Sequence, residues 1–95
     1  MWILRSIETE QEHTLRFQPG AVKTVGRGRR SDFVIDAALM SRVHCRFSAS
    51  TEQLVVEDLQ STNGTYVNNN RVTCLALKDG DQLRLGHLEF LVSRE

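Results

Sequence analysis

The chain is divided into short alternating or apolar runs, each bounded by turn residues, and it contains no helix-period segment of useful length. In one such run, apolar residues at 43, 45 and 47 alternate with His44, Arg46 and Ser48. This alternation predicts a strand with one face packed on a core and the other facing outward. The fold class predicted from the whole pattern is all-β, as a sandwich or barrel.

Strands are expected at residues 2–7, 14–17, 22–26, 33–35, 43–48, 53–59, 65–67, 71–74, 82–85 and 88–92. The joints between them carry residues that favour tight turns. Pro19-Gly20 and Asp79-Gly80 each preset a turn, and the three asparagines at 68–70 tolerate positive φ in a hairpin.

With 95 residues, the chain has the length of one domain with one core, so residues 1–95 are expected to form a single module. No apolar run approaches the roughly 18 residues of a membrane helix, and the start Met1-Trp2-Ile3 lacks the features of a signal peptide. We therefore expect an intracellular protein without membrane contact. The first expected strand follows Met1 at once, which suggests a natural N-terminus and the N-terminal module of a larger protein.

The two cysteines, Cys45 and Cys74, each lie in an apolar strand pattern and lack CxxC spacing or a nearby set of metal ligands. Both are expected to be buried, reduced thiols. The sequence predicts no metal site and no cofactor.

Twelve basic and twelve acidic side chains give a formal net charge of +0, which argues against direct nucleic-acid binding. The charges are unevenly distributed, however. Five arginines lie in the first half of the chain around expected loops, namely Arg27, Arg29, Arg30, Arg42 and Arg46. A local positive site can therefore exist on a neutral protein.

Three polar blocks fall where a strand should meet a loop: residues 26–27, 41–44 and 61–65. Arg27 offers planar, permanently charged donors, Ser41 a hydroxyl with the charge of Arg42 beside it, and the third block a hydroxyl and an amide from Thr62 and Asn63. These groups suit a phosphate held on a peptide. Taken singly, each block also suits a structural role, such as a surface ion pair, a turn, or, for His44, a hydrogen-bonding strut.

The polar blocks resemble, in order and spacing, the signature of forkhead-associated (FHA) domains: Gly-Arg, then Ser-Arg-x-His, then Ser-x-Asn-Gly-Thr followed by Val-Asn. Residues 77–86 also look typical of that family. The resemblance covers nearly the whole chain. It implies an eleven-stranded β-sandwich whose loops at one end bind phosphothreonine in a partner protein.

By this resemblance, the residues that bind the phosphopeptide are Arg27, Ser41, Arg42, Thr62 and Asn63. Arg27 and Ser41 would contact the phosphate with help from Arg42, Thr62 would lie by the phosphothreonine methyl group, and Asn63 would bind the peptide backbone. The residues that shape the loops are Gly26, His44 and Gly64.

Family members also read the residue three places after the phosphothreonine, and the matching positions here are Leu39, Met40 and Gly86. Leu39 and Met40 carry no basic group, so we expect an aliphatic or permissive preference. Asn69 replaces a glycine that many relatives have in a hairpin, and asparagine tolerates the same conformation.

The resemblance implies a phosphothreonine-dependent interaction module of a signalling or DNA-damage-response scaffold, nuclear by family analogy. An enzyme is disfavoured, because Ser41 and His44 have no evident third orienting residue. The remaining alternative is a homodimerisation module with a weak or vestigial phosphate site, which could use exposed apolar residues such as Trp2 or Met40.

Overall fold

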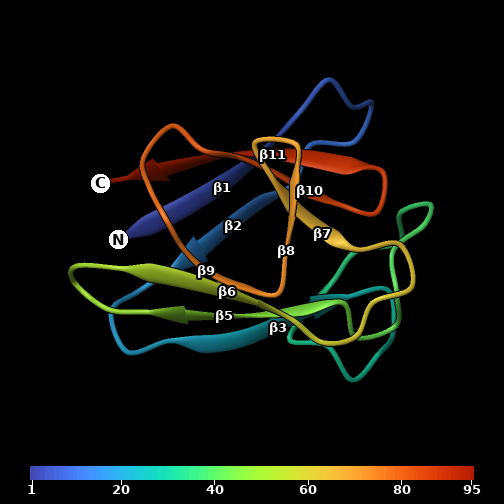
Figure 1. Cartoon of the computed structure of the whole chain (residues 1–95), viewed down its shortest axis with the longest axis horizontal. Helices are drawn as coiled ribbons and strands as arrows, with labels where there is room; N and C mark the ends of the chain where they lie inside the picture. Colours follow the sequence, from blue (N-terminus) through green and yellow to red (C-terminus); the bar gives the residue numbers. More distant parts are fainter.

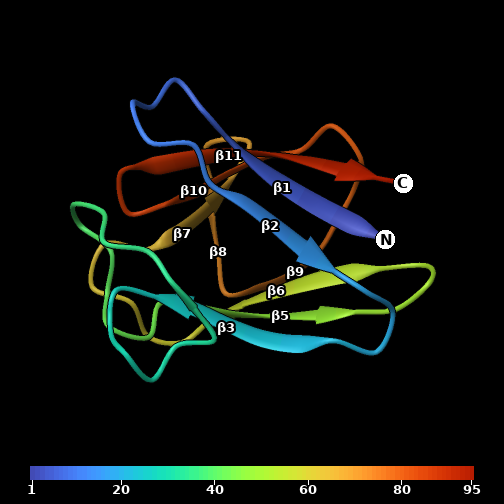
Figure 2. The same cartoon turned by 180° about the vertical axis from the view of Figure 1, so that it is seen from behind.

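The computed structural model describes residues 1–95 and consists of two β-sheets packed face to face, with no helix. Figures 1 and 2 show the two layers from opposite sides. The eleven strands are β1 (Trp2–Ile7), β2 (Thr14–Phe17), β3 (Val22–Gly26), β4 (Phe33–Val34), β5 (Cys45–Ala49), β6 (Leu54–Asp58), β7 (Thr65–Val67), β8 (Asn70–Val72), β9 (Cys74–Leu77), β10 (Gln82–Leu85) and β11 (Leu88–Arg94). The structure contains no helix that is long and apolar enough to cross a membrane.

One sheet has six strands in the order β2-β1-β11-β10-β7-β8, and the other has five in the order β4-β3-β5-β6-β9. All neighbours are antiparallel except β3 and β4, which pair in parallel. The predicted all-β sandwich, with the eleven strands that the family resemblance implied, is confirmed.

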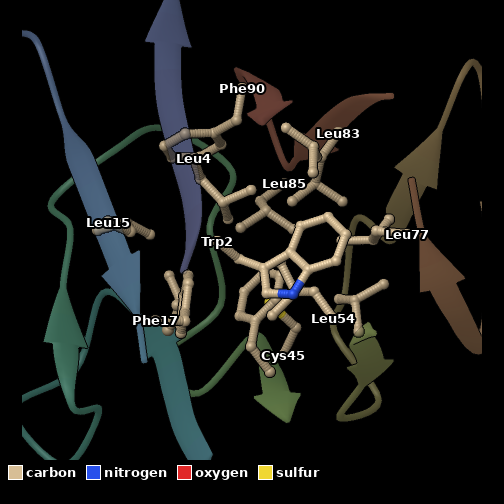
Figure 3. Close-up of a cluster of buried hydrophobic side chains, with 14 of the residues drawn as sticks. Trp2, Leu4, Leu15, Phe17, Cys45, Leu54, Leu77, Leu83, Leu85 and Phe90 are labelled. Carbon is tan, nitrogen blue, oxygen red and sulfur yellow. The ribbon is translucent and has the colours of Figure 1, made fainter. Parts of the chain in front are cut away.

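The inward-facing side chains of the two sheets form a single core of 19 buried hydrophobic residues. Period-two alternation builds it: in β2, Leu15 and Phe17 are buried, whereas Thr14 and Arg16 are exposed. Figure 3 shows the cluster, with Trp2 lying among leucines from both sheets. Trp2 is only 3% exposed, so it is a core residue and offers no surface for a homodimer contact.

The prediction of a single strand at 71–74 is wrong, because this segment contributes to two strands, β8 and β9, which belong to different sheets. β8 pairs with β7, the chain then crosses between the sheets at Thr73, and β9 pairs with β6. No glycine or proline marks the crossing, and the Thr73 carbonyl accepts a hydrogen bond from the Asp58 amide at 2.9 Å. The break is therefore set by pairing with distant strands rather than by local turn chemistry.

Two expectations about side-chain burial also need correction. Cys45 is fully buried, and burial raises the pKa of its thiol, but Cys74 is exposed, because it lies on β9 at the edge of its sheet. His44, expected on the outward face of a strand, precedes β5 and is fully buried.

The two chain ends lie side by side, at the end of the sandwich away from the loops that precede β5 and β7 (Figure 1). The Met1 ammonium group donates to the Glu95 carbonyl at 2.8 Å, and the Glu95 amide donates to the Met1 carbonyl at 2.7 Å. The sandwich therefore has one end formed by the termini and another formed by the polar loops.

A matched pair of leucine substitutions tests the core assignment. Leu83 on β10 is 0% exposed and Leu91 on β11 is 41% exposed. We expect Leu83→Ala to lower the free energy of unfolding by about 2–5 kcal/mol, because it removes buried methyl groups and leaves a cavity. Leu91→Ala should cost about 0.5 kcal/mol. Urea denaturation measures both, and equal losses would contradict the assignment.

Candidate functional site

Four loops meet at the end of the sandwich opposite the termini: 27–32, 35–44, 59–64 and the β10–β11 turn at 86–87. In Figure 1 they lie on the right, at the ends of the strands that they join. The three polar blocks of the sequence fall on these loops or at their edges. Residues far apart in the chain therefore come together on one surface.

The first block is fixed to the second by backbone hydrogen bonds. The Arg27 amide donates to the Ser41 carbonyl at 2.9 Å, and the Gly28 amide donates to the Arg42 carbonyl at 2.8 Å. At Gly26, a Cβ atom would lie 2.2 Å from the Arg42 carbonyl oxygen, so no larger residue fits this approach. Glycine at this position is therefore a requirement of the contact between the two loops.

His44 joins the second block to the third. Its Nδ1 accepts a hydrogen bond from the Ser41 amide at 3.1 Å, which leaves the proton on Nε2, and Nε2 donates to the Gly64 carbonyl at 2.8 Å. Burial lowers the pKa of His44, against opposing contributions from the Gly64 carbonyl and the Asp58 carboxylate. The imidazole is therefore neutral and holds two loops in fixed relation, and Gly64 lies in the third block with a φ of +91°.

Asp58, for which the sequence predicted no role, organises the third block. Its carboxylate accepts hydrogen bonds from the Ser61 hydroxyl at 2.5 Å, the Ser61 amide at 3.1 Å and the Thr65 hydroxyl at 2.8 Å. Burial alone would raise the pKa of Asp58, but the hydrogen bonds from Ser61 and Thr65 outweigh it and the pKa is lowered. The spacing Asp-x-x-Ser before Asn-Gly is the signal from which this turn could have been found.

The Ser41 hydroxyl oxygen accepts a hydrogen bond from the Thr62 amide at 3.0 Å. This places the hydroxyl where the second block meets the third, with its own proton free to be donated. His44 contacts the Ser41 backbone amide and not the hydroxyl, so the pair lacks the hydrogen bond of a nucleophile with its base. In the third block, Thr62 and Asn63 are both exposed.

The residues expected to set specificity divide into two groups. Leu39 is 56% exposed with a φ of 65°, and its carbonyl accepts a hydrogen bond from the Asn63 side-chain amide at 3.1 Å. Gly86 lies against it, since a Cβ atom on Gly86 would approach the Leu39 carbonyl oxygen to 2.4 Å. Met40 is 2% exposed and belongs to the core, so its side chain forms no part of the binding surface and offers no homodimer contact.

The guanidinium groups of Arg27 and Arg42 have no carboxylate partner. Both residues are exposed, and the three salt bridges of the chain are made by Arg5, Arg46 and Arg94. Arg46 pairs with Glu57 across β5 and β6, so it does not contribute to the loop surface. The loops that carry Arg27, Ser41 and Arg42 therefore present unneutralised positive charge.

The protonation of His44 predicts a pH dependence of stability. The folded-state pKa lies below the unfolded value of about 6.5, so acidification protonates the unfolded chain first. We expect the free energy of unfolding to fall as the pH drops below about 6.5, and this fall to be smaller in His44→Gln. Urea denaturation between pH 8 and 5 measures it, with the exposed His87→Gln as the control; identical pH profiles for wild type and His44→Gln would refute the assignment.

Comparison with known proteins relates this geometry to one family. A family model for the FHA domain matches residues 23–86. The FHA domain-containing protein FhaA of Mycobacterium tuberculosis is 41% identical over 68 residues, covering 72% of this chain and 13% of FhaA.

Solved structures agree over almost the full chain. The FhaA FHA domain, complexed with the intracellular domain of a second protein, has a TM-score of 0.87 at 34% identity and covers 97% of this chain and 99% of that domain. Mycobacterium tuberculosis EmbR in complex with a low-affinity phosphopeptide has a TM-score of 0.81 at 30% identity, covering 97% and 24% respectively. The matches span only 13% of FhaA, 8% of a mycobacterial ABC transporter and 41% of the regulator GarA. With the family model spanning both the polar loops and the strands that carry them, the chain belongs to the FHA domain family.

Proposed function

We propose that this domain binds a phosphothreonine-containing segment of a partner protein and so mediates an association that depends on phosphorylation, without catalysis of its own. The observation that carries the proposal is that unneutralised guanidinium groups and a hydroxyl with a proton to donate lie on loops that are hydrogen-bonded to one another. Arg27 and Arg42 have no carboxylate partner. The Ser41 hydroxyl oxygen accepts a hydrogen bond from the Thr62 amide, and its proton remains available for donation. Such a set binds an anion and leaves it chemically unchanged.

A phosphate ester fits this set of donors. At neutral pH it carries about 1.5 to 2 negative charges and three acceptor oxygens, for which charge-assisted hydrogen bonds are the strongest partners. Arg27 and Ser41 would bind the phosphate, with Arg42 assisting. Thr62 would contact the phosphothreonine methyl group, whose burial contributes about 0.8 kcal/mol. Asn63, which is anchored to Leu39 by its amide nitrogen, would use its remaining groups on the peptide backbone.

The relatives support this kind of function and limit its setting. FhaA has been solved with a partner domain, and EmbR with a phosphopeptide. The named sequence relatives are mycobacterial, so the expectation of a nuclear DNA-damage scaffold has no support among them. We place the domain in phosphorylation-dependent signalling, as one module of a larger protein.

We propose that Leu39 and Gly86 set the preference for the residue three places after the phosphothreonine. Met40 does not contribute to this preference, because its side chain is buried. Leu39 exposes an aliphatic side chain at this edge of the site, and Gly86 lies under its carbonyl. An aliphatic or permissive preference fits that surface. The homodimer alternative is left without its two suggested contact residues, because Trp2 and Met40 are both buried.

Substitution of Arg27 tests the proposal. We expect Arg27→Ala to weaken binding of a phosphothreonine peptide by at least about 30-fold, since loss of a charge partner costs about 2–5 kcal/mol, without a change in thermal stability. Isothermal titration calorimetry measures the affinity, with unphosphorylated and phosphoserine peptides for comparison. Arg16→Ala, which removes an exposed arginine on β2, is the matched control. Equal affinities of Arg27→Ala and Arg16→Ala would reject the proposed phosphate contact.

A further inference from the structure

A second concentration of positive charge lies next to the proposed phosphate site. A hollow between loop 27–32 and the end of loop 35–44, which we call the basic hollow, is lined by Gly28, Arg29, Arg30, Arg42 and Val43. It shares Arg42 with the proposed phosphate contacts, whereas Arg27, Ser41, Thr62 and Asn63 do not line it. Arg29 and Arg30 therefore have no role in the function proposed above.

The arginines of the basic hollow are not neutralised within the protein. None of the three salt bridges involves Arg29, Arg30 or Arg42. The acid closest to them in the sequence, Asp32, is engaged elsewhere: its carboxylate accepts hydrogen bonds from the Thr24 amide at 2.8 Å and the Thr24 hydroxyl at 3.2 Å. The hydrogen bond from the Thr24 backbone is the main cause of the lowered pKa of Asp32.

Backbone contacts hold these like charges together. The Gly28 amide and the Ser31 hydroxyl both donate to the Arg42 carbonyl, at 2.8 and 2.7 Å, and the Ser31 amide closes the turn onto the Gly28 carbonyl at 3.1 Å. Ser31 is 6% exposed, so this connection is buried beneath the charged side chains. The hollow is thus a preorganised surface whose charge has no internal partner, and such a surface favours an anionic ligand.

We propose that the basic hollow is a second anion site, which binds a carboxylate or phosphate group on the partner segment, on the N-terminal side of the phosphothreonine. This assignment rests on the proposed function, because it takes the phosphothreonine to lie at Arg27 and Ser41. The ligand class is therefore an acidic or doubly phosphorylated peptide.

The side of the phosphothreonine follows from the order of contacts along residues 42 to 39. The Arg42 carbonyl accepts a hydrogen bond from Gly28, which lines the hollow, and the Ser41 carbonyl accepts one from Arg27, the proposed phosphate contact. The Leu39 carbonyl lies against Gly86. If the residue three places after the phosphothreonine lies at Leu39, the hollow faces the residues that precede the phosphothreonine. An extended peptide advances about 3.3 Å per residue, so positions one to three before the phosphothreonine are within its range.

A separate hollow next to Gly86 carries acidic side chains. Its lining includes Glu8, Asp36 and Glu89 together with His13 and His87. Carboxylates placed after the phosphothreonine would approach these acids and be repelled. The position of a negative charge in the peptide, rather than its presence alone, should therefore decide its effect on affinity.

Four phosphothreonine peptides of equal length test this assignment by calorimetry. The first peptide carries alanines at the three positions before the phosphothreonine, and the second carries glutamates at these positions. The third carries a phosphoserine two places before the phosphothreonine, and the fourth carries glutamates at the three positions after it. We expect the preceding glutamates or phosphoserine to tighten binding about tenfold relative to alanine, and the following glutamates to give no gain. Comparison of glutamate with phosphoserine tells which anion the hollow prefers.

The double variant Arg29→Ala/Arg30→Ala should abolish this gain and bind the alanine peptide within about threefold of wild type. Arg16→Ala/Lys78→Ala removes the same charge from exposed positions outside the hollow and should keep the gain. Thermal melting of each variant checks that it is folded. If wild type binds the alanine peptide but shows no gain, or if the gain survives in Arg29→Ala/Arg30→Ala, the second site is refuted while the proposed function stands. If no phosphorylated peptide binds at all, both are refuted.

Discussion

The imidazole of His44 is the interaction on which the recognition surface depends. It accepts from the Ser41 amide and donates to the carbonyl of Gly64, which lies twenty positions after His44 in the chain, and so connects two loops. Because the ring is buried and neutral, it can make both bonds at once, which a protonated ring could not do with the same partners. The hydroxyl of Ser41 and the amide of Asn63 take their places from this connection.

Carboxylates in this end of the sandwich are used to build turns rather than to balance charge. Asp58 holds Ser61 and Thr65, and Asp32 holds Thr24, through hydrogen bonds that keep each carboxylate ionised. The arginines of loops 27–32 and 35–44 are consequently left without partners, although the whole chain is neutral. Local structure thus separates charges that the composition balances, and a positive surface for an anionic partner results.

The sheet edges show where local patterns reach their limit. Apolar patterns and turn residues located β1, β2, β3, β7 and β10 with the observed bounds. Burial alternates along β2, β7 and β10, whereas β1 begins with three buried residues and β3 is located mainly by the turns around it. Residues 70–77 have no such marker, and their division into β8 and β9 follows from pairing with β7 and β6. The exposure of Cys74 has the same origin, since an edge position is a property of the assembled sheet.

The sequence by itself determined the all-β class, most of the strands and the family, because alternation and turn residues act locally and the polar blocks have a specific order. It also pointed to Arg27, Ser41, Thr62 and Asn63 as neighbours. Only the tertiary structure decided that Met40 is core, that Asp58 builds the third block, and that Arg29 and Arg30 gather around Arg42. Burial, hydrogen-bond partners and the absence of a neutralising acid all depend on contacts between distant segments, which no local pattern encodes.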